Sequence, residues 1–136
     1  MPREVVLICG PPGAGKSTYA SGLGLDAYDL DDPQWPSERL FVDALRAIGR
    51  DPYARAAVIR SGATESSRKK ASSMIRATRV VMLPVPLETC IDRIRHRKRT
   101  HPPLRRQIEG ARSWWDRYEP LGDGETHAAD PRAADW

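Results

Sequence analysis

Nine consecutive residues near the N-terminus have the composition of a phosphate-binding loop. The segment G-P-P-G-A-G-K-S-T matches the pattern G-x-x-x-x-G-K-[ST] at every position. Its glycines allow backbone amides to turn toward phosphate oxygens, Lys16 would bridge the β- and γ-phosphates, and the Ser17 hydroxyl would bind Mg²⁺. The segment therefore predicts a site for a nucleoside triphosphate and Mg²⁺. Its residues are Gly10, Pro11, Pro12, Gly13, Ala14, Gly15, Lys16, Ser17 and Thr18.

Three aspartates form a second group that could act on an acceptor. Asp29, Asp31 and Asp32 stand at the end of a predicted strand, residues 25–30, and precede Pro33. Transfer of a phosphoryl group to a hydroxyl needs an aspartate near the acceptor, and in doubly wound folds such groups stand at the carboxyl ends of strands. Acidic residues are also common in turns before proline. The pattern therefore leaves open the catalytic role and the choice among the three aspartates.

An arginine-rich stretch, residues 93–99, could supply cations to the same site. Arg93 and Arg97 are four residues apart and would share one side of a helix. Cations at this position would neutralise the charge that spreads over the γ-phosphate oxygens during transfer. We expect a helical lid that brings Arg93 and Arg97 over the nucleotide, and a solvated basic face is the other interpretation.

Strands alternating with helices must position these groups. Residues 4–9 form a mostly apolar run rich in β-branched side chains, which indicates a strand buried on both faces. Residues 56–60 fit a strand or the continuation of a short helix capped by Asp51-Pro52. The alternation predicts a three-layer α/β P-loop NTPase fold with a small, mainly parallel sheet and an arginine-bearing helical lid. We expect the second strand to lie beside the first. The predicted strands are 4–9, 25–30, 56–60 and 79–83, and the predicted helices are 16–21, 37–48, 65–77, 86–98 and 104–118.

Local signals mark the ends and faces of these helices. Ser37 is a good N-cap for the helix that runs through residue 48, and Gly49 is its expected stop. Apolar residues recur at steps of three and four from Leu104 to Tyr118, which predicts an amphipathic helix. We expect Trp114 and Trp115 to pack there rather than to stack on bases.

The composition is that of one soluble domain. The 136 residues are 40% hydrophobic, which is enough to bury one core. No apolar run is long enough for a membrane span, and no signal peptide is recognised. Cys9 and Cys90 lie far apart in apolar segments, as buried, reduced thiols do. We expect a cytoplasmic protein without zinc or membrane contact, with a domain at residues 1–118 and a loose acidic tail at 119–136.

Positive charge is concentrated in the middle of the chain. Residues 55–118 hold 16 Lys and Arg against 5 Asp and Glu, whereas the whole chain has a net charge of only +4. A segment of this kind favours a polyanionic partner, which would be a nucleoside triphosphate, a nucleic acid or both. A solvated basic face would have the same composition.

Several classes of P-loop protein are disfavoured by what the chain lacks. No Asn-Lys-x-Asp motif for reading guanine is present, and the chain is short for a switch GTPase. Motor and AAA-type ATPases carry a hydrophobic strand that ends in aspartate, whereas the third and fourth predicted strands end in Arg60-Ser61 and Leu83-Pro84. A small kinase fits the length best.

The sequence resembles the kinase half of phage-type polynucleotide kinases, within a wider group of adenylate-, gluconate- and zeta-toxin-like kinases. The resemblance rests on the phosphate loop, the Asp29-Leu30-Asp31-Asp32 turn, residues 84–93 and the arginine-rich stretch before Pro102-Pro103-Leu104. It implies ATP as the nucleotide and Asp31 as the base that accepts the 5′-hydroxyl proton. It also implies Lys16 and Ser17 on the phosphates and Mg²⁺, with Arg97 and Arg93 as lid cations.

Two positions depart from the pattern of this family. Gln34 stands where the family has an arginine that holds the acceptor phosphate, and Arg39 is a candidate replacement. The third strand ends in Ile59-Arg60-Ser61, where the family has an aspartate. Both departures concern the acceptor more than ATP.

Three functional hypotheses follow. The first is a kinase for the 5′-hydroxyl of DNA or RNA, which the Asp31 turn, the arginine lid and the basic segment favour. The second is a kinase for a nucleotide or a small metabolite with a hydroxyl group, which the missing acceptor arginine leaves open. The third is an ATP-binding regulatory module that binds nucleic acid or protein without useful phosphotransfer.

Overall fold

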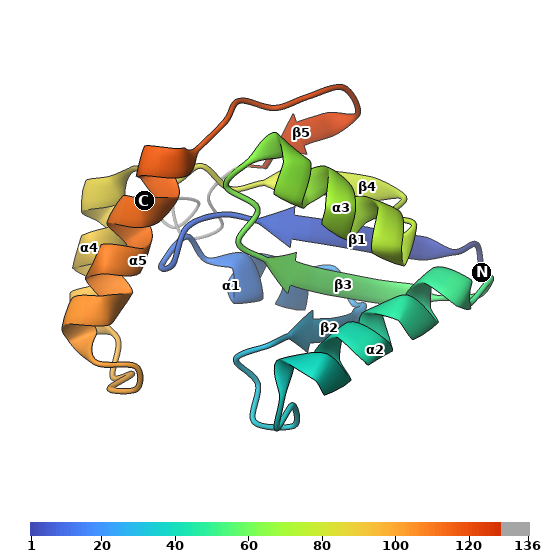
Figure 1. Cartoon of the computed structure of the whole chain (residues 1–136), viewed down its shortest axis with the longest axis horizontal. Coiled ribbons are helices and arrows are strands. Elements are labelled where there is room, and N and C mark those ends of the chain that lie inside the picture. The colour runs from blue at the N-terminus through green and yellow to red at the C-terminus, as the bar shows by residue number, and fades with distance from the viewer. Residues whose placement is uncertain (129–136) are drawn as a thin grey trace.

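Alternating strands and helices build a parallel sheet with helices on both faces (Figure 1). The computed structural model describes residues 1–128. The strands are β1 (Glu4–Cys9), β2 (Asp26–Asp29), β3 (Arg55–Arg60), β4 (Arg79–Met82) and β5 (Glu125–His127). The helices are α1 (Lys16–Ser21), α2 (Glu38–Arg50), α3 (Glu65–Ile75), α4 (Leu87–His96) and α5 (Leu104–Arg117). The predicted α/β fold with a parallel sheet is confirmed.

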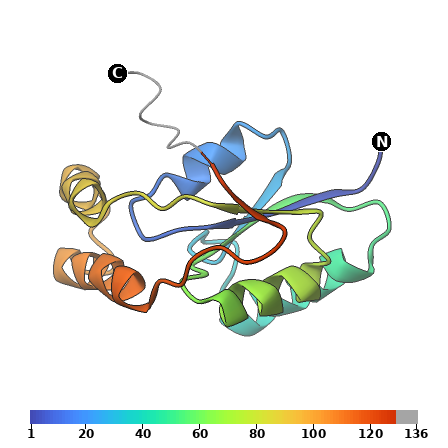
Figure 2. The same ribbon diagram turned by 90° about the horizontal axis from the view of Figure 1, so that it is seen from above.

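The helices form layers around the sheet, as Figure 2 shows. Helix α1 lies on one face, and α2 and α3 lie together on the other. Helices α4 and α5 pack side by side beyond the carboxyl ends of the strands (Figure 1). This arrangement gives three layers and places the α4–α5 pair at the edge of the sheet where the loops after the strands converge.

The strand order is β2-β3-β1-β4-β5, and every neighbouring pair is parallel. The expectation that the second strand lies beside the first is therefore wrong, because β3 separates β2 from β1. Residues that follow β3 consequently lie between the phosphate loop after β1 and the aspartates after β2. The place of β3 between β1 and β2 therefore decides which residues line the site.

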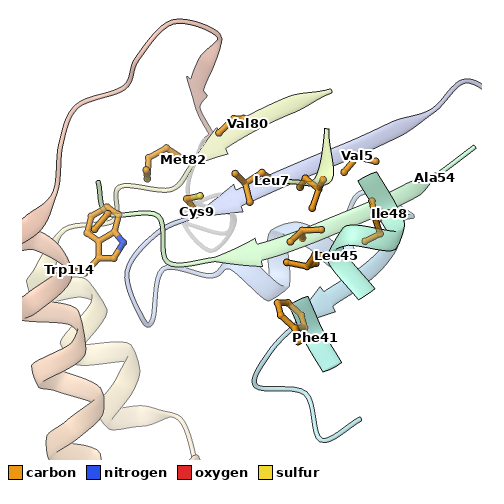
Figure 3. Packing of buried hydrophobic residues seen from close by; sticks show 14 residues of the cluster. Val5, Leu7, Cys9, Phe41, Leu45, Ile48, Ala54, Val80, Met82 and Trp114 are labelled. Atoms are coloured by element: carbon orange, nitrogen blue, oxygen red, sulfur yellow. The ribbon is translucent and has the colours of Figure 1, made fainter. Parts of the chain in front are cut away.

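Each face of the sheet buries its own apolar cluster. Successive residues of β1 point to opposite faces, so that Val6 and Ile8 pack toward α1 whereas their neighbours pack toward α2 and α3. Trp114 of α5 is buried and its indole Nε1 donates to the Ser61 carbonyl oxygen at 2.6 Å, which confirms its packing role. Figure 3 shows the cluster on the α2 face, which includes Val5, Leu7, Cys9, Phe41, Leu45 and Trp114.

Most predicted element boundaries agree with the structure to within a few residues, and the exceptions have physical causes. Ser37 caps α2 as predicted, since its hydroxyl accepts from the Leu40 amide at 3.3 Å. Gly49 lies inside α2 instead of ending it. Asp51 accepts a hydrogen bond from the Tyr53 amide and forms a turn rather than a short helix, which leaves residues 55–60 free to form β3.

Gly49 is required by the close approach of α2 to α3. A Cβ atom at this position would lie 2.1 Å from the backbone carbonyl oxygen of Met74. We expect Gly49→Ala to lower the free energy of unfolding by about 1–2 kcal/mol, because overpacking outweighs the gain in helix propensity. Thermal or urea unfolding measures the change.

Gly110 offers a matched control within α5. A Cβ atom there would meet only the Pro12 side chain, at an ordinary contact distance of 3.5 Å. Gly110→Ala should therefore be neutral or stabilising. Equal effects of the two substitutions would contradict the proposed role of Gly49 in helix packing.

The chain after residue 118 differs from the loose tail that the composition suggested. Strand β5 pairs with β4 and extends the sheet. Arg68 of α3 donates to the carbonyl oxygens of Glu119 and Pro120 and to the Glu125 carboxylate. The predicted boundary at residue 118 is therefore too early. The remainder of the expected tail, residues 129–136, lies outside the described residues.

Within residues 1–128, no helix is long and apolar enough to cross a membrane.

Candidate active site

The phosphate loop connects the end of β1 to the start of α1. Gly13 and Gly15 have φ angles of 84° and 90°, in the left-handed region that favours glycine. Gly13 is also limited by space, because a Cβ atom would lie 2.8 Å from the backbone carbonyl oxygen of Cys90 in α4. The motif thus has the strand–loop–helix context that phosphate binding requires, and α4 packs directly against it.

Lys16, the first residue of α1, turns its ammonium group back over the loop. Its Nζ donates to the Gly10 carbonyl oxygen at 2.6 Å. Burial lowers the pKa of Lys16, whereas the carboxylates of Asp29 and Asp31 act in the opposite direction. An anion bound in the loop would further favour the charged ammonium.

Cys9 lies beneath the loop at the end of β1 and has no chemical role that the structure supports. It is buried and free, as is Cys90, which confirms the expectation of two buried thiols. Burial raises the pKa of the Cys9 thiol to about 12. The thiol therefore stays protonated and unreactive at neutral pH.

Ser17 and Asp29 place two oxygen donors at the mouth of the loop. The Ser17 hydroxyl donates to Asp29 Oδ2 at 3.3 Å. Mg²⁺ in nucleotide sites takes a few protein oxygens and completes its shell with phosphate oxygens and water. Within residues 1–128, no group of three or more His, Cys, Asp and Glu side chains could hold a metal alone. The donors present fit Mg²⁺ bound together with a nucleotide.

The three aspartates differ in their contacts. Asp29 faces Ser17. Asp32 accepts from the Gln34 amide at 3.1 Å, which stabilises the turn, and it does not line the cavity. Asp31 is exposed, lines the cavity, and lies 3.6 Å from the Arg99 guanidinium. Asp31 thus shares the cavity with Asp29 and lies beside an arginine of the cavity.

The expected lid arginines both face the cavity, but they do not lie on one helix. Arg93 is buried in α4, and its Nη1 contacts the Gly13 carbonyl oxygen at 3.4 Å. Helix α4 ends at His96, two residues earlier than predicted, and Arg97 follows it. The Arg97 guanidinium donates to Gln107 Oε1 at 2.7 and 3.0 Å.

Gln107 of α5 organises the loop between α4 and α5, which carries Arg97 and Arg99. It is buried, and its Nε2 donates to the carbonyl oxygens of Arg99 and Pro102. Together with the contact to Arg97, this makes Gln107 the centre of the loop between α4 and α5. A glutamine within an amphipathic pattern carries no local signal of burial, so this role of Gln107 was not predictable from the sequence.

One cavity of about 460 Å³ joins these groups. The predicted residues that line it are Pro12 to Thr18 of the loop, Asp29, Asp31, Arg93 and Arg97. Gly10 and Pro11, at the start of the loop, do not line it. Arg39, the candidate replacement for the acceptor arginine, does not line the cavity either. Arg99 of the arginine-rich stretch also lines it, and the lining residues that sequence reasoning did not place there are Leu30, Glu38, Ile59, Arg60 and Ser61.

Comparison with known proteins identifies the fold and no closer family. No family model matches the sequence, and no curated protein sequence matches it. A gluconokinase from Sinorhizobium meliloti 1021 has a similar structure, with a TM-score of 0.61 and 19% identity over 95% of this chain and 83% of that chain. A sugar kinase from Janibacter sp. HTCC2649 has a TM-score of 0.61 and 20% identity over 96% and 87%.

Kti12 from Chaetomium thermophilum, solved in complex with ADP-AlF3, also superposes on the chain. Its TM-score is 0.58, with 17% identity over 95% of this chain and 94% of that chain. The 136-residue chain itself has the fold of small P-loop kinases. At these identities the likeness concerns the fold, and the roles of individual residues in the P-loop kinase site stay predictions.

Proposed function

We propose that this protein is an ATP- and Mg²⁺-dependent kinase that phosphorylates a hydroxyl group of a small molecule. The observation that carries the proposal is the single cavity that contains the phosphate loop, Asp31 and several arginines. The gluconokinase and the sugar kinase of similar structure are named for small acceptors with hydroxyl groups. The small-acceptor alternative is therefore better supported than the polynucleotide 5′-hydroxyl that the family resemblance suggested.

The proposed reaction is an in-line displacement at the γ-phosphorus of ATP. Asp31 takes the proton of the acceptor hydroxyl, whose oxygen attacks the γ-phosphorus. The bond to the β–γ bridging oxygen breaks, and ADP leaves. Lys16, Arg93 and Arg97 stabilise the negative charge that spreads over the phosphate oxygens. Mg²⁺, when bound at Ser17 and Asp29, would neutralise charge on the β- and γ-phosphates.

A phosphotransfer screen tests the proposal. Labelled γ-phosphate is followed from ATP and Mg²⁺ to separate pools of sugars, sugar acids, nucleoside monophosphates and a 5′-hydroxyl oligonucleotide. We expect label on a small acceptor. Label on the oligonucleotide alone would restore the polynucleotide hypothesis, and ATP binding without any labelled product would favour a regulatory module.

Asp31→Asn tests the assignment of the base. Removal of a general base typically lowers the rate by 10²–10⁴-fold, so we expect kcat to fall at least about 100-fold while ATP affinity changes less than about twofold. Steady-state kinetics with the best acceptor and a nucleotide-binding titration measure the two effects. Asp32→Asn is the matched control and should retain activity. Full activity of Asp31→Asn would exclude Asp31 as the base.

A further inference from the structure

Arg60 lies at the cavity because of the strand order. It is the last residue of β3, which lies between β1 with its phosphate loop and β2 with its aspartates. Its side chain is half-buried and lines the cavity. The guanidinium carbon lies 5.5 Å from the centroid of the Phe41 ring, within the range of a cation–π contact.

Arg60 differs from the other arginines of the cavity in its surroundings. Arg99 lies within ion-pair distance of Asp31, and Arg97 donates to Gln107. Within residues 1–128, the Phe41 ring is the recorded partner of the Arg60 guanidinium, and no carboxylate pairs with it. A cation held at a cavity wall by an aromatic ring keeps its planar donors available for an anion.

The Arg60 side chain points to a different face of the sheet from the one on which the phosphate loop packs. Alternation along β3 places Arg60 on the same face as Val58, which belongs to the cluster with Phe41 of α2. Ala14 of the phosphate loop belongs to the cluster on the opposite face. Glu38, the first residue of α2, also lines the cavity. An anion at Arg60 would therefore belong to the acceptor rather than to ATP.

We propose that Arg60 selects the acceptor, and that the acceptor is a small hydroxy compound carrying an anionic oxygen group, either a carboxylate or a phosphate. The proposal rests on the proposed kinase function and deepens it. The hydroxyl lies at Asp31 and the anionic group at Arg60. Planar, bidentate recognition of carboxylate and phosphate is the interaction for which arginine is suited.

An anion-binding experiment tests Arg60 without requiring phosphotransfer. The protein is saturated with Mg²⁺ and a non-hydrolysable ATP analogue, so that the phosphate loop is filled. Inorganic phosphate, gluconate and the neutral sugar glucose are then titrated separately, with thermal stability as the readout. We expect at least one of the two anions, and not glucose, to raise the melting temperature. The more effective anion distinguishes a phosphorylated acceptor from a carboxylated one.

Variants at two arginines decide the assignment. Arg60→Gln should raise the half-saturating anion concentration about tenfold or more, which is typical for loss of a charge-assisted hydrogen-bonded pair. Arg60→Lys, which keeps the charge and loses the planar fork, should fall between Arg60→Gln and the wild type. Arg39→Gln removes an exposed arginine outside the cavity and should bind as the wild type does. Equal anion binding by all variants, or none by the wild type, would overturn the proposal.

The acceptor screen separates the two proposals. Phosphotransfer to a neutral acceptor without anion binding at Arg60 would leave the kinase function standing and overturn the role of Arg60. Anion binding lost in Arg60→Gln, without phosphotransfer to any acceptor, would overturn the kinase function and with it the acceptor role of Arg60. Loss of nucleotide binding in Arg60→Gln would place Arg60 on the phosphates of ATP and would also overturn the proposal.

Discussion

Lys16→Met is expected to lower phosphotransfer from ATP at least about 100-fold, the loss typical when one group that stabilises transition-state charge is removed. Methionine is close to lysine in length and removes the only formal charge of the phosphate loop. The recorded hydrogen bond of Lys16 goes to the Gly10 carbonyl oxygen of the same loop, so the overall fold should persist. Turnover with the best acceptor of the screen measures the effect, and circular dichroism checks the fold.

Two further variants make the Lys16 result specific. Lys70→Met removes an exposed lysine of α3 outside the cavity and should retain activity. Lys16→Arg keeps the charge but replaces a compact ammonium with a planar fork, and it should remain strongly impaired. Activity of Lys16→Met within about threefold of the wild type would show that the loop does not act on the transferred phosphate.

Glu125→Gln is expected to lower the free energy of unfolding by about 3–5 kcal/mol, because it leaves a buried charge without its partner. Arg68 Nε lies 2.9 Å from Glu125 Oε2, and the side chains are 0% and 7% exposed. The other carboxylate oxygen of Glu125 accepts from the Gly122 amide at 2.7 Å. Urea unfolding with a signal from the buried tryptophan measures the loss.

A surface pair and a double variant serve as controls for this ion pair. Asp43 and Arg46 form an exposed pair at 3.5 Å, and Asp43→Asn makes the same acid-to-amide change with an expected cost below about 1 kcal/mol. The double variant Arg68→Met with Glu125→Leu should be more stable than Glu125→Gln, because no unpaired charge remains buried. A loss below 1 kcal/mol for Glu125→Gln would contradict the view that β5 joins the fold through this pair.

The phosphate loop and the helices with strong local signals were predictable from the sequence. The loop is a continuous segment whose glycines, lysine and serine carry their chemical meaning within nine residues. The Ser37 cap and the amphipathic pattern of α5 are equally local, since they depend on neighbours within one or two turns. Short-range signals of this kind do not depend on how distant parts of the chain pack together.

The strand order and the positions of the acidic and basic side chains in the cavity were decided by the tertiary structure. Nothing within residues 26–29 or 55–60 specifies which strand lies beside β1, because pairing depends on crossovers that run over the whole chain. Strand β5 has only three residues and too little pattern to predict, and its contacts with β4 and Arg68 are distant in the sequence. The sequence by itself therefore determined an α/β domain with a phosphate-loop motif, whereas only the tertiary structure placed Asp31 beside Arg99 and brought Arg60 into the same cavity.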